Sequence, residues 1–333
     1  MKVAIIGAGH IGTTLAYTLL IKGFVSEIAI VNRTREKAFG EALDMTHAQA
    51  SVSHAVRIYS GDYRACEGAE VIVVTAGAAT VKGQSRLEIV AANAAIFREL
   101  IPKIMEYNSE GIFVLVTNPV DVNTWLTLRY SGLPWHRVIG SGTVLDCQRF
   151  QSFLSRHFNV HSANVQGLII GEHGESMIPL WSRASICGIP LTEFPEYDRQ
   201  EMEDIFDMTR RGAAMVRVTK DSTQYATAMS VSRTVESILL DKKEVLTVST
   251  LVSDFYGIAD ICLSMPAVVG KRGIERVLKP QLSDDERDKL LRSAAILKMV
   301  LASVGDDVAD QKCPEAQFEL QGPSAPEFVE AID

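Results

Sequence analysis

The chain has 333 residues, of which 47% are hydrophobic and 22% charged, proportions typical of a soluble globular protein long enough for two domains. Its net charge of −8 argues against nucleic acid as a partner, and no apolar run reaches the ~18 residues of a membrane-spanning helix. The five cysteines are widely spaced and form no CxxC pair or zinc pattern, so we expect free thiols in the reducing cytoplasm and no bound metal.

A glycine-rich turn follows the first apolar run. Residues 3–6 predict a buried parallel strand rather than a signal peptide, and a helical pattern of leucines begins after the turn. Between them, Gly-x-Gly-x-x-Gly suits a tight turn, close approach of a pyrophosphate, and packing of the helix on the strand. The context favours dinucleotide binding over an ordinary glycine-rich turn. The predicted cofactor residues here are Gly7, Gly9, His10, Ile11 and Gly12.

The second strand, residues 27–31, ends at Asn32, near the position where NAD-binding units carry an acid for the ribose hydroxyls. Without that carboxylate, a 2′-phosphate is not repelled. Arg33 can grip it, Thr34 offers a hydroxyl and Lys37 adds positive charge. The stretch resembles the Asn-Arg-Thr-x-x-Lys/Arg pattern of NADP-dependent shikimate-type dehydrogenases. We therefore expect NADP(H), with a solvated basic helix start in an NAD(H) enzyme as the alternative.

Further strands at 56–59, 70–75, 112–116 and 138–140 alternate with helices at 36–50 and 87–107. This alternation predicts a doubly wound parallel α/β sheet, a Rossmann dinucleotide-binding domain over residues 1–142. Strand 70–75 leads into Thr75, Ala76 and Gly77 and then a polar segment ending at Arg86, where a lid is expected. Composition alone favours a surface helix start for Arg86. Asn118, held by the following proline, faces the crevice at the end of strand 112–116.

The second half predicts an α+β substrate domain over residues 143–304, with strands at 165–170, 245–252 and 261–269 and helices at 198–220, 223–240 and 284–302. Asp146 and Arg149 face the same way on a helix, although Thr143 and Asp146 also have the spacing of a capping box. His173, between two glycines after a strand, is a candidate catalytic residue. Residues 305–333 hold eight acids and one base, which predicts a poorly ordered tail or an arm on a neighbouring subunit.

These motifs resemble the L-lactate/malate dehydrogenase family from residue 1 to about residue 304. The resemblance is carried by Ile6-Gly-Ala-Gly-His-Ile-Gly12, Thr75-Ala-Gly-Ala78, Gly83-Gln-Ser-Arg86, Thr117-Asn-Pro-Val-Asp121, Gly140-Ser-Gly-Thr143, Leu145-Asp-Cys-Gln-Arg149 and Gly171-Glu-His-Gly174. It implies an oxidoreductase that moves a hydride between a nicotinamide cofactor and an (S)-2-hydroxy acid/2-oxo acid pair, working as a homodimer or homotetramer.

The resemblance also implies residue roles. His173 would be the acid and base, Asp146 would hold its ring, and Arg86 would polarise the reacting carbonyl from the lid. Arg149 would clamp the substrate carboxylate. Asn118 would bond the substrate or the nicotinamide, and Thr223 would lie beside the substrate.

Two positions depart from the family pattern. Thr80 stands where lactate enzymes carry Gln and malate enzymes carry Arg, and it cannot pair with a second carboxylate, which is costly to bury alone. Thr227 replaces an apolar residue usual in lactate enzymes. We therefore expect a neutral substrate side chain larger than that of lactate, with an NAD-dependent malate or lactate dehydrogenase as the alternative.

Overall fold

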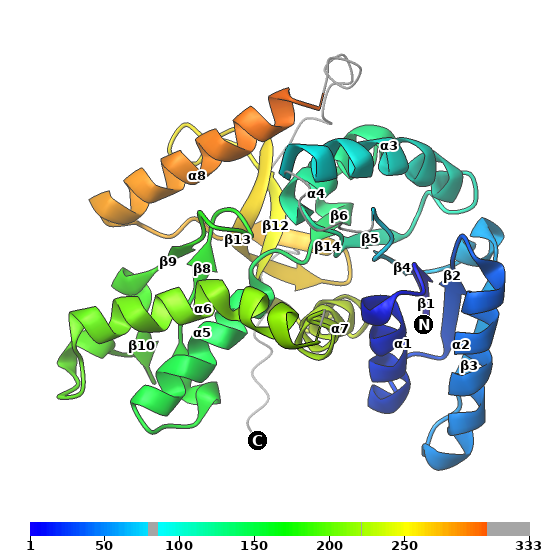
Figure 1. Ribbon diagram of the computed structural model, residues 1–333, viewed down its shortest axis with the longest axis horizontal. Helices are drawn as coiled ribbons and strands as arrows, with labels where there is room; N and C mark the ends of the chain where they lie inside the picture. Colours follow the sequence, from blue (N-terminus) through cyan, green and yellow to red (C-terminus); the bar gives the residue numbers. More distant parts are fainter. Residues whose placement is uncertain (79–85, 221, 305–333) are drawn as a thin grey trace, which may run out of the picture.

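The computed structural model describes residues 1–78, 86–220 and 222–304. In the first half, strands and helices alternate as the apolar runs predict (Figure 1). The strands are β1 (Lys2–Ile6), β2 (Glu27–Val31), β3 (Arg57–Gly61), β4 (Val71–Val74), β5 (Ile112–Leu115) and β6 (Val138–Gly140). The helices are α1 (His10–Lys22), α2 (Arg35–His47), α3 (Arg86–Met105) and α4 (Val120–Ser131).

These six strands are parallel and lie in the order β3-β2-β1-β4-β5-β6. The order reverses between β1 and β4, which opens a crevice at their carboxyl ends. In Figure 1, α3 and α4 lie above the sheet, while α1 lies below it beside α7 (Tyr225–Leu239). With both faces covered, β4 and β5 are entirely buried, which explains their uninterrupted apolar sequences.

The second half contains three more long helices, α5 (Val144–His157), α6 (Arg199–Lys220) and α8 (Asp284–Ala302). Its long strands are β12 (Glu244–Val252), β13 (Ile261–Gly270) and β14 (Gly273–Val277). Five two-residue strands complete it: β7 (Val165–Gln166), β8 (Ile169–Ile170), β9 (Ile178–Pro179), β10 (Ser185–Ile186) and β11 (Ile189–Pro190). Helix α8 begins with a full capping box between Ser283 and Glu286.

The long strands of the second half extend the first sheet. Strand β12 pairs antiparallel with β6, with Ser249 opposite Gly140, and β13 and β14 follow antiparallel. Within the described residues, this makes one nine-stranded sheet that crosses the expected boundary at residues 142 and 143. The α/β class with a Rossmann sheet and a following α/β half is as predicted.

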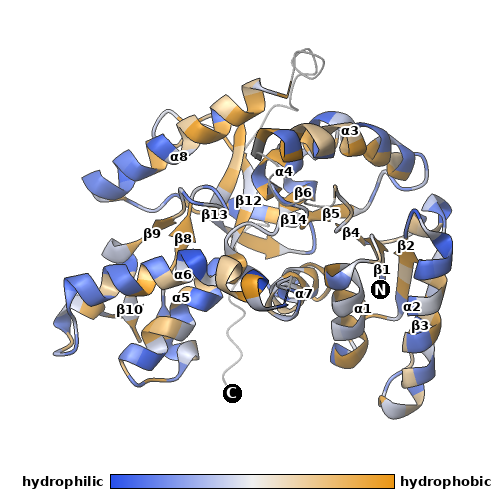
Figure 2. Ribbon diagram, in the orientation of Figure 1, coloured by the Kyte–Doolittle hydropathy of each residue, from blue (hydrophilic) through white to orange (hydrophobic). Residues whose placement is uncertain are grey.

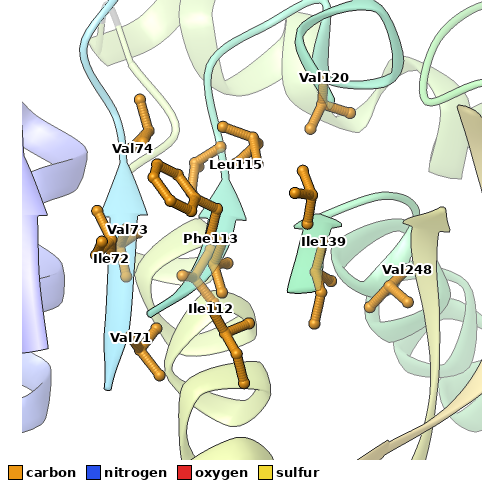
Figure 3. Close-up of a cluster of buried hydrophobic side chains, with 14 of the residues drawn as sticks. Val71, Ile72, Val73, Val74, Ile112, Phe113, Leu115, Val120, Ile139 and Val248 are labelled. Carbon is orange, nitrogen blue, oxygen red and sulfur yellow. The ribbon is translucent and has the colours of Figure 1, made fainter. Parts of the chain in front are cut away.

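The core runs through this shared sheet. Figure 3 shows side chains of β4, β5, β6 and β12 packed together, among them Val73, Phe113, Ile139 and Val248. Each of these four is fully buried. In Figure 2 the central strands are coloured as hydrophobic, whereas α3 and α8 carry hydrophilic residues along their length. Apolar burial thus joins the two halves of the chain.

Several elements of the structure differ from those expected from the sequence. The expected strand at 165–170 is two short strands, because Gly167 approaches the Phe150 ring and each piece pairs with a different partner. The helix expected to reach residue 50 ends at His47 and continues as a 3₁₀ turn, Ala48–Ser51. Strand β14 was not expected, since its five residues include two charged ones that weaken the apolar pattern.

Candidate active site

The glycine-rich turn lies at the carboxyl end of β1, where each glycine meets a different constraint. Gly7 has φ of +116°, and its carbonyl accepts a hydrogen bond from the Thr75 hydroxyl at 3.1 Å. A Cβ at Gly12 would lie 2.0 Å from the Gly7 carbonyl oxygen, so only glycine allows α1 to approach the turn. A Cβ at Gly9 would meet nothing within 4 Å. Open space in front of backbone N–H groups at a helix start fits a pyrophosphate.

A cavity of about 570 Å³ extends from this turn towards α2 and α3. It brings together most of the predicted cofactor residues, namely Gly7, Gly9, Asn32, Arg33, Lys37, Thr75, Ala76 and Gly77. Tyr63, Ile96 and Leu100 give it an apolar side that suits a nucleobase. Of the remaining predicted cofactor residues, Ile11 and Asn118 line a second cavity, Gly12 lies beneath the turn and Thr34 is the N-cap of α2. His10 is the exposed first residue of α1.

The Asn32 side chain links the turn to the start of α2. Its Oδ1 accepts the Ala8 N–H at 3.1 Å, and its Nδ2 donates to the Thr34 carbonyl at 3.0 Å. Through these two hydrogen bonds, the Asn32 side chain holds the glycine-rich turn in place. Arg33 and Lys37, also at the cavity wall, form no ion pair with any other described residue. They are therefore the cations available to a bound anion at this end.

The second cavity, about 440 Å³, contains the candidate catalytic residues. Helix α5 begins after Thr143, and its Asp146 is 1% exposed. Asp146 Oδ2 lies 2.6 Å from His173 Nδ1, and its Oδ1 accepts from Arg149 Nη1 at 2.9 Å. The capping-box alternative does not hold, because Thr143 makes no side-chain cap bond and donates instead to the Ile169 carbonyl. Asp146 thus faces the histidine.

The histidine stands on a turn fixed from both sides. Gly171, with φ of +87°, exchanges two backbone hydrogen bonds with Ser264 of β13. The backbone N–H of His173 donates to Asp121 Oδ2 at 2.8 Å. Burial favours the neutral ring, but Asp146 first and Asp121 second outweigh burial and Arg149, so the pKa of His173 is raised above its ordinary value. The ring is therefore held as a proton donor.

The pKa of Asp146 moves the opposite way. Burial opposes its ionisation, but His173 and then Arg149 outweigh burial and hold the pKa of this carboxyl below its ordinary value. The pair is thus an ionised carboxylate beside a histidine that readily takes a proton, an arrangement suited to reversible proton transfer.

Helix α6 approaches Arg149 through a glycine. A Cβ built on Gly212 would lie 3.2 Å from Arg149 Cδ, which is tighter than ordinary packing. Arg210 and Arg211 of the same helix also line the cavity, and both pair with Asp207, at 2.7 Å and 3.6 Å. Arg149 is thereby confined between α5 and α6, where its guanidinium reaches the cavity.

The end of β5 supplies the opposite wall. Asn118, joined to Pro119 by a cis peptide bond, lines the cavity together with Thr223 and Thr227 at the start of α7. The buried Asn93 of α3 braces this wall, since its Nδ2 donates to the Asn118 carbonyl and its Oδ1 accepts the Ala78 N–H. It ties the loops after β4 and β5 together.

Two candidate residues lie wholly or partly outside the described parts of the chain. Thr80 lies wholly outside them. Arg86 is the first residue of α3, but its side chain lies outside them. The acidic segment 305–333 also lies outside them. Within the described parts, no group of three His, Cys, Asp or Glu side chains could hold a metal ion. No helix there has the length and apolar character needed to cross a membrane.

The sequence patterns assigned no role to several residues of this centre: Asn93, Asp121, Gly212 and Ser230. Asp121 offered one signal in the sequence, since this carboxylate follows Pro119 and Val120 directly after the apolar run 112–116, where the crevice opens. The structure places it among nine consecutive buried residues of α4, where a buried acid requires partners.

Comparison with known proteins gives one consistent result. The lactate/malate dehydrogenase NAD-binding domain matches residues 1–140, and the family's alpha/beta C-terminal domain matches residues 143–307. An L-lactate dehydrogenase of Thermoanaerobacterium saccharolyticum is 43% identical over 305 residues, which are 90% of this chain and 98% of that protein. A probable L-lactate dehydrogenase of Schizosaccharomyces pombe is 40% identical over 310 residues, covering 92% and 93%.

Among solved structures, a minor L-lactate dehydrogenase from Enterococcus mundtii superposes with a TM-score of 0.89 at 34% identity, over 92% of this chain and 99% of that one. A lactate dehydrogenase from a deep-sea metagenome library gives 0.88 at 32% identity, covering 91% and 98%. With these matches and the site described above, the chain belongs to the lactate/malate dehydrogenase family of NAD(P)-dependent 2-hydroxy acid oxidoreductases.

Proposed function

We propose that this enzyme interconverts an (S)-2-hydroxy acid with a neutral side chain and the matching 2-oxo acid, and that it prefers NADP(H) to NAD(H). The observation that carries the reaction type is the buried carboxylate–histidine pair beside an arginine in one cavity. The (S) configuration follows the names of the relatives, which are L-lactate dehydrogenases.

In the proposed reaction, Arg149 binds the substrate carboxylate with its guanidinium fork, which sets the reacting carbon beside His173. Protonated His173 donates the proton on Nε2 to the carbonyl oxygen during reduction and takes it back during oxidation. Asp146, on Nδ1, fixes the tautomer and stabilises the positive ring. The nicotinamide, when bound, supplies or accepts the hydride.

Three further residues complete the proposal. Arg86, at the end of the expected lid, would polarise the reacting carbonyl. Asn118 would bond the substrate or the nicotinamide, and Thr223 would contact the substrate; both line the cavity.

The neutral side chain is supported by the charges around the cavity. Arg210 and Arg211 already pair with Asp207, and Glu175 lies 4.0 Å from Arg210, so these guanidiniums are largely compensated. The third α6 arginine of the cavity, Arg217, is exposed, so solvent screens its charge. Thr80 would leave a second carboxylate unpaired. Thr227 adds a hydroxyl to the wall of the cavity, whose volume leaves room beyond a methyl group.

A second candidate is lactate and pyruvate themselves, favoured by the names of relatives 40–43% identical to this chain. Initial reduction rates against 2-oxo acids from pyruvate to bulky aromatic ones, with oxaloacetate included, distinguish the two. A higher kcat/KM for a larger neutral acid supports the proposal. Pyruvate as the best substrate supports the second candidate, and oxaloacetate as the best would contradict both.

The NADP(H) preference rests on Arg33 and Lys37 in the cofactor cavity and on the missing acid after β2. Arg33→Ala should lower kcat/KM for NADPH by more than tenfold while changing that for NADH little, since a guanidinium–phosphate contact is worth about 1.5–3 kcal/mol. Arg35→Ala is the matched control, because Arg35 lies on the same segment but lines a separate hollow with Phe39. Equal effects on both cofactors would refute the assignment.

The role of His173 is tested by His173→Asn. Turnover should fall by two to four orders of magnitude, the usual contribution of a general acid, while NADPH fluorescence shows unchanged cofactor binding. A variant that keeps turnover within tenfold would remove His173 from the mechanism.

We also propose that residues 1–142 bind the cofactor, that residues 143–304 supply the substrate-binding and catalytic groups, and that the chain forms a homodimer or homotetramer in the cytoplasm. Exposed apolar side chains on α6 and α7, including Met215, Val218 and Met229, support association. Light scattering during size exclusion tests the subunit number.

A further inference from the structure

We propose that Asp121 is a second carboxylate of the catalytic centre, a positioning residue that holds His173 through its backbone and stabilises the imidazolium. This inference rests on the proposed role of His173 as the proton donor. It assigns a task to an acid that accepts a hydrogen bond from the backbone N–H of the histidine.

Asp121 connects three separate parts of the fold. It lies in the first turn of α4, and only 2% of its surface is exposed. Its Oδ2 accepts the His173 N–H at 2.8 Å, and its Oδ1 accepts the Ser249 hydroxyl from β12 at 2.6 Å. The first turn of a helix and two hydrogen bonds both favour the ionised form. Asp121 is thus a buried negative charge fixed next to the histidine turn.

The turn needs this anchor. Gly171 ties its start to Ser264, the Glu172 N–H donates to Ser293 Oγ at 3.0 Å, and the bond from the His173 N–H to Asp121 fixes the histidine itself. Without an acceptor there, a partly buried N–H would be left unpaired and the backbone could rotate. The ring direction would then depend on Asp146 alone. Two anchors on opposite sides, one on the backbone and one on Nδ1, define where Nε2 points.

Charged groups on several elements face His173. Asp146 and Arg149 come from α5 and Asp121 from α4. The cavity also contains Glu175 beside the histidine turn and three arginines of α6. The α6 arginines are half-buried or exposed and are screened by solvent, and two are paired with Asp207. Of the acids that raise the pKa of His173, Asp121 follows Asp146. Neutralising it should therefore move the titration of the ring.

Asp121→Asn removes the charge and keeps the shape, because the amide oxygen can accept the His173 N–H while the amide nitrogen faces the Ser249 hydroxyl. Reduction requires the protonated ring, so its kcat/KM falls as pH rises through this pKa. Oxidation requires the neutral ring and rises over the same range. In the variant, the fall of reduction and the rise of oxidation, the two limbs of the pH profile, should both move to lower pH by about one unit. A ring titration by NMR, assigned with His173→Asn, should show the same shift.

The matched control is Asp260→Asn, which removes a surface carboxylate paired with Arg129. It should leave both limbs unmoved. If Asp121→Asn folds and its limbs and ring titration match the wild type, Asp121 is merely structural and the inference fails. If His173→Asn keeps its turnover, the proposed mechanism fails instead, whatever Asp121 does.

Should Asp121→Asn not fold, Ser249→Ala tests the same contact. Without this donor the Asp121 carboxylate can turn away from the histidine turn, so turnover of the reduction should fall and the ring titration of His173 should move to lower pH. A folded Ser249→Ala enzyme with wild-type turnover and ring titration would overturn the inference.

Discussion

Three glycine-to-alanine substitutions separate the architectural and phosphate-binding tasks of the first turn. At Gly12 the new Cβ would lie 2.0 Å from the Gly7 carbonyl oxygen, about 1.4 Å closer than the 3.4 Å at which ordinary van der Waals contact begins. Helix α1 must then move off β1, and overpacking of this kind costs about 1–3 kcal/mol or more. We expect Gly12→Ala to lower the free energy of unfolding by at least that much.

Gly9→Ala should behave differently. Its backbone, with φ of −84° and ψ of 179°, suits any residue, and its Cβ meets nothing within 4 Å. The added methyl would stand in the open space assigned to the pyrophosphate. Stability should change little, while the Kd for NADPH rises by about tenfold or more, the factor that corresponds to 1.4 kcal/mol.

Gly40→Ala is the control, since it lies within α2 with nothing near its Cβ. It should gain about 0.8–1 kcal/mol of helix stability and leave cofactor binding alone. Urea unfolding and NADPH fluorescence titration measure both quantities for all three variants. A Gly9→Ala enzyme that binds NADPH as tightly as the wild type would refute the placement of the phosphates.

Two other substitutions test the substrate side, and a thiol-labelling experiment tests which cysteines are open to solvent. Asp146→Asn should cut reduction at pH 7 by about 100-fold or more, since a charge pair near 4 Å is worth about 4 kcal/mol at an effective dielectric constant of 20, and a loss below threefold would contradict the pairing. Gly212→Val should raise KM for the 2-oxo acid by pressing on the carboxylate-binding arginine, while an unchanged KM would show that α6 yields. In a Cys313→Ser background, a thiol reagent at pH 7 should label the exposed Cys187 before the buried cysteines, and Cys187→Ser should abolish the fast phase.

The slow labelling expected of the buried cysteines has a physical basis. Burial raises the pKa of Cys66 to about 12 and that of Cys147 to about 11, so both are protonated at neutral pH. Persistence of the fast phase after Cys187 is removed would mean that one of these sites opens readily.

Much of the first half could be predicted from sequence, because parallel strands covered on both faces leave unbroken apolar runs. The expected limits of β2 and β6 agree with the structure. The sequence could single out His173 because a histidine between two glycines is a poor packing residue. It could single out Asp146 and Arg149 because an acid and a base three residues apart share one face of a helix. Their meeting in one cavity follows the family resemblance and is a feature of the structure.

Other features depend on long-range pairing that no local pattern carries. The joining of β12 to β6 links residues more than 100 positions apart. The bonds of Asp121 to His173 and Ser249 likewise span 52 and 128 positions. The paired state of Arg210 and Arg211, which bears on substrate charge, also requires coordinates. Periodicity predicts elements, but it does not choose their distant partners.

The shared sheet limits how this chain can be divided. Cut after residue 142, the first half would leave β6 as an edge strand with its backbone groups and the apolar faces beside Val248 open to other chains. The excised dinucleotide-binding half is therefore expected to aggregate. A biosensor or fusion protein built from this enzyme should keep β6 and β12 in one chain and place insertions in exposed loops.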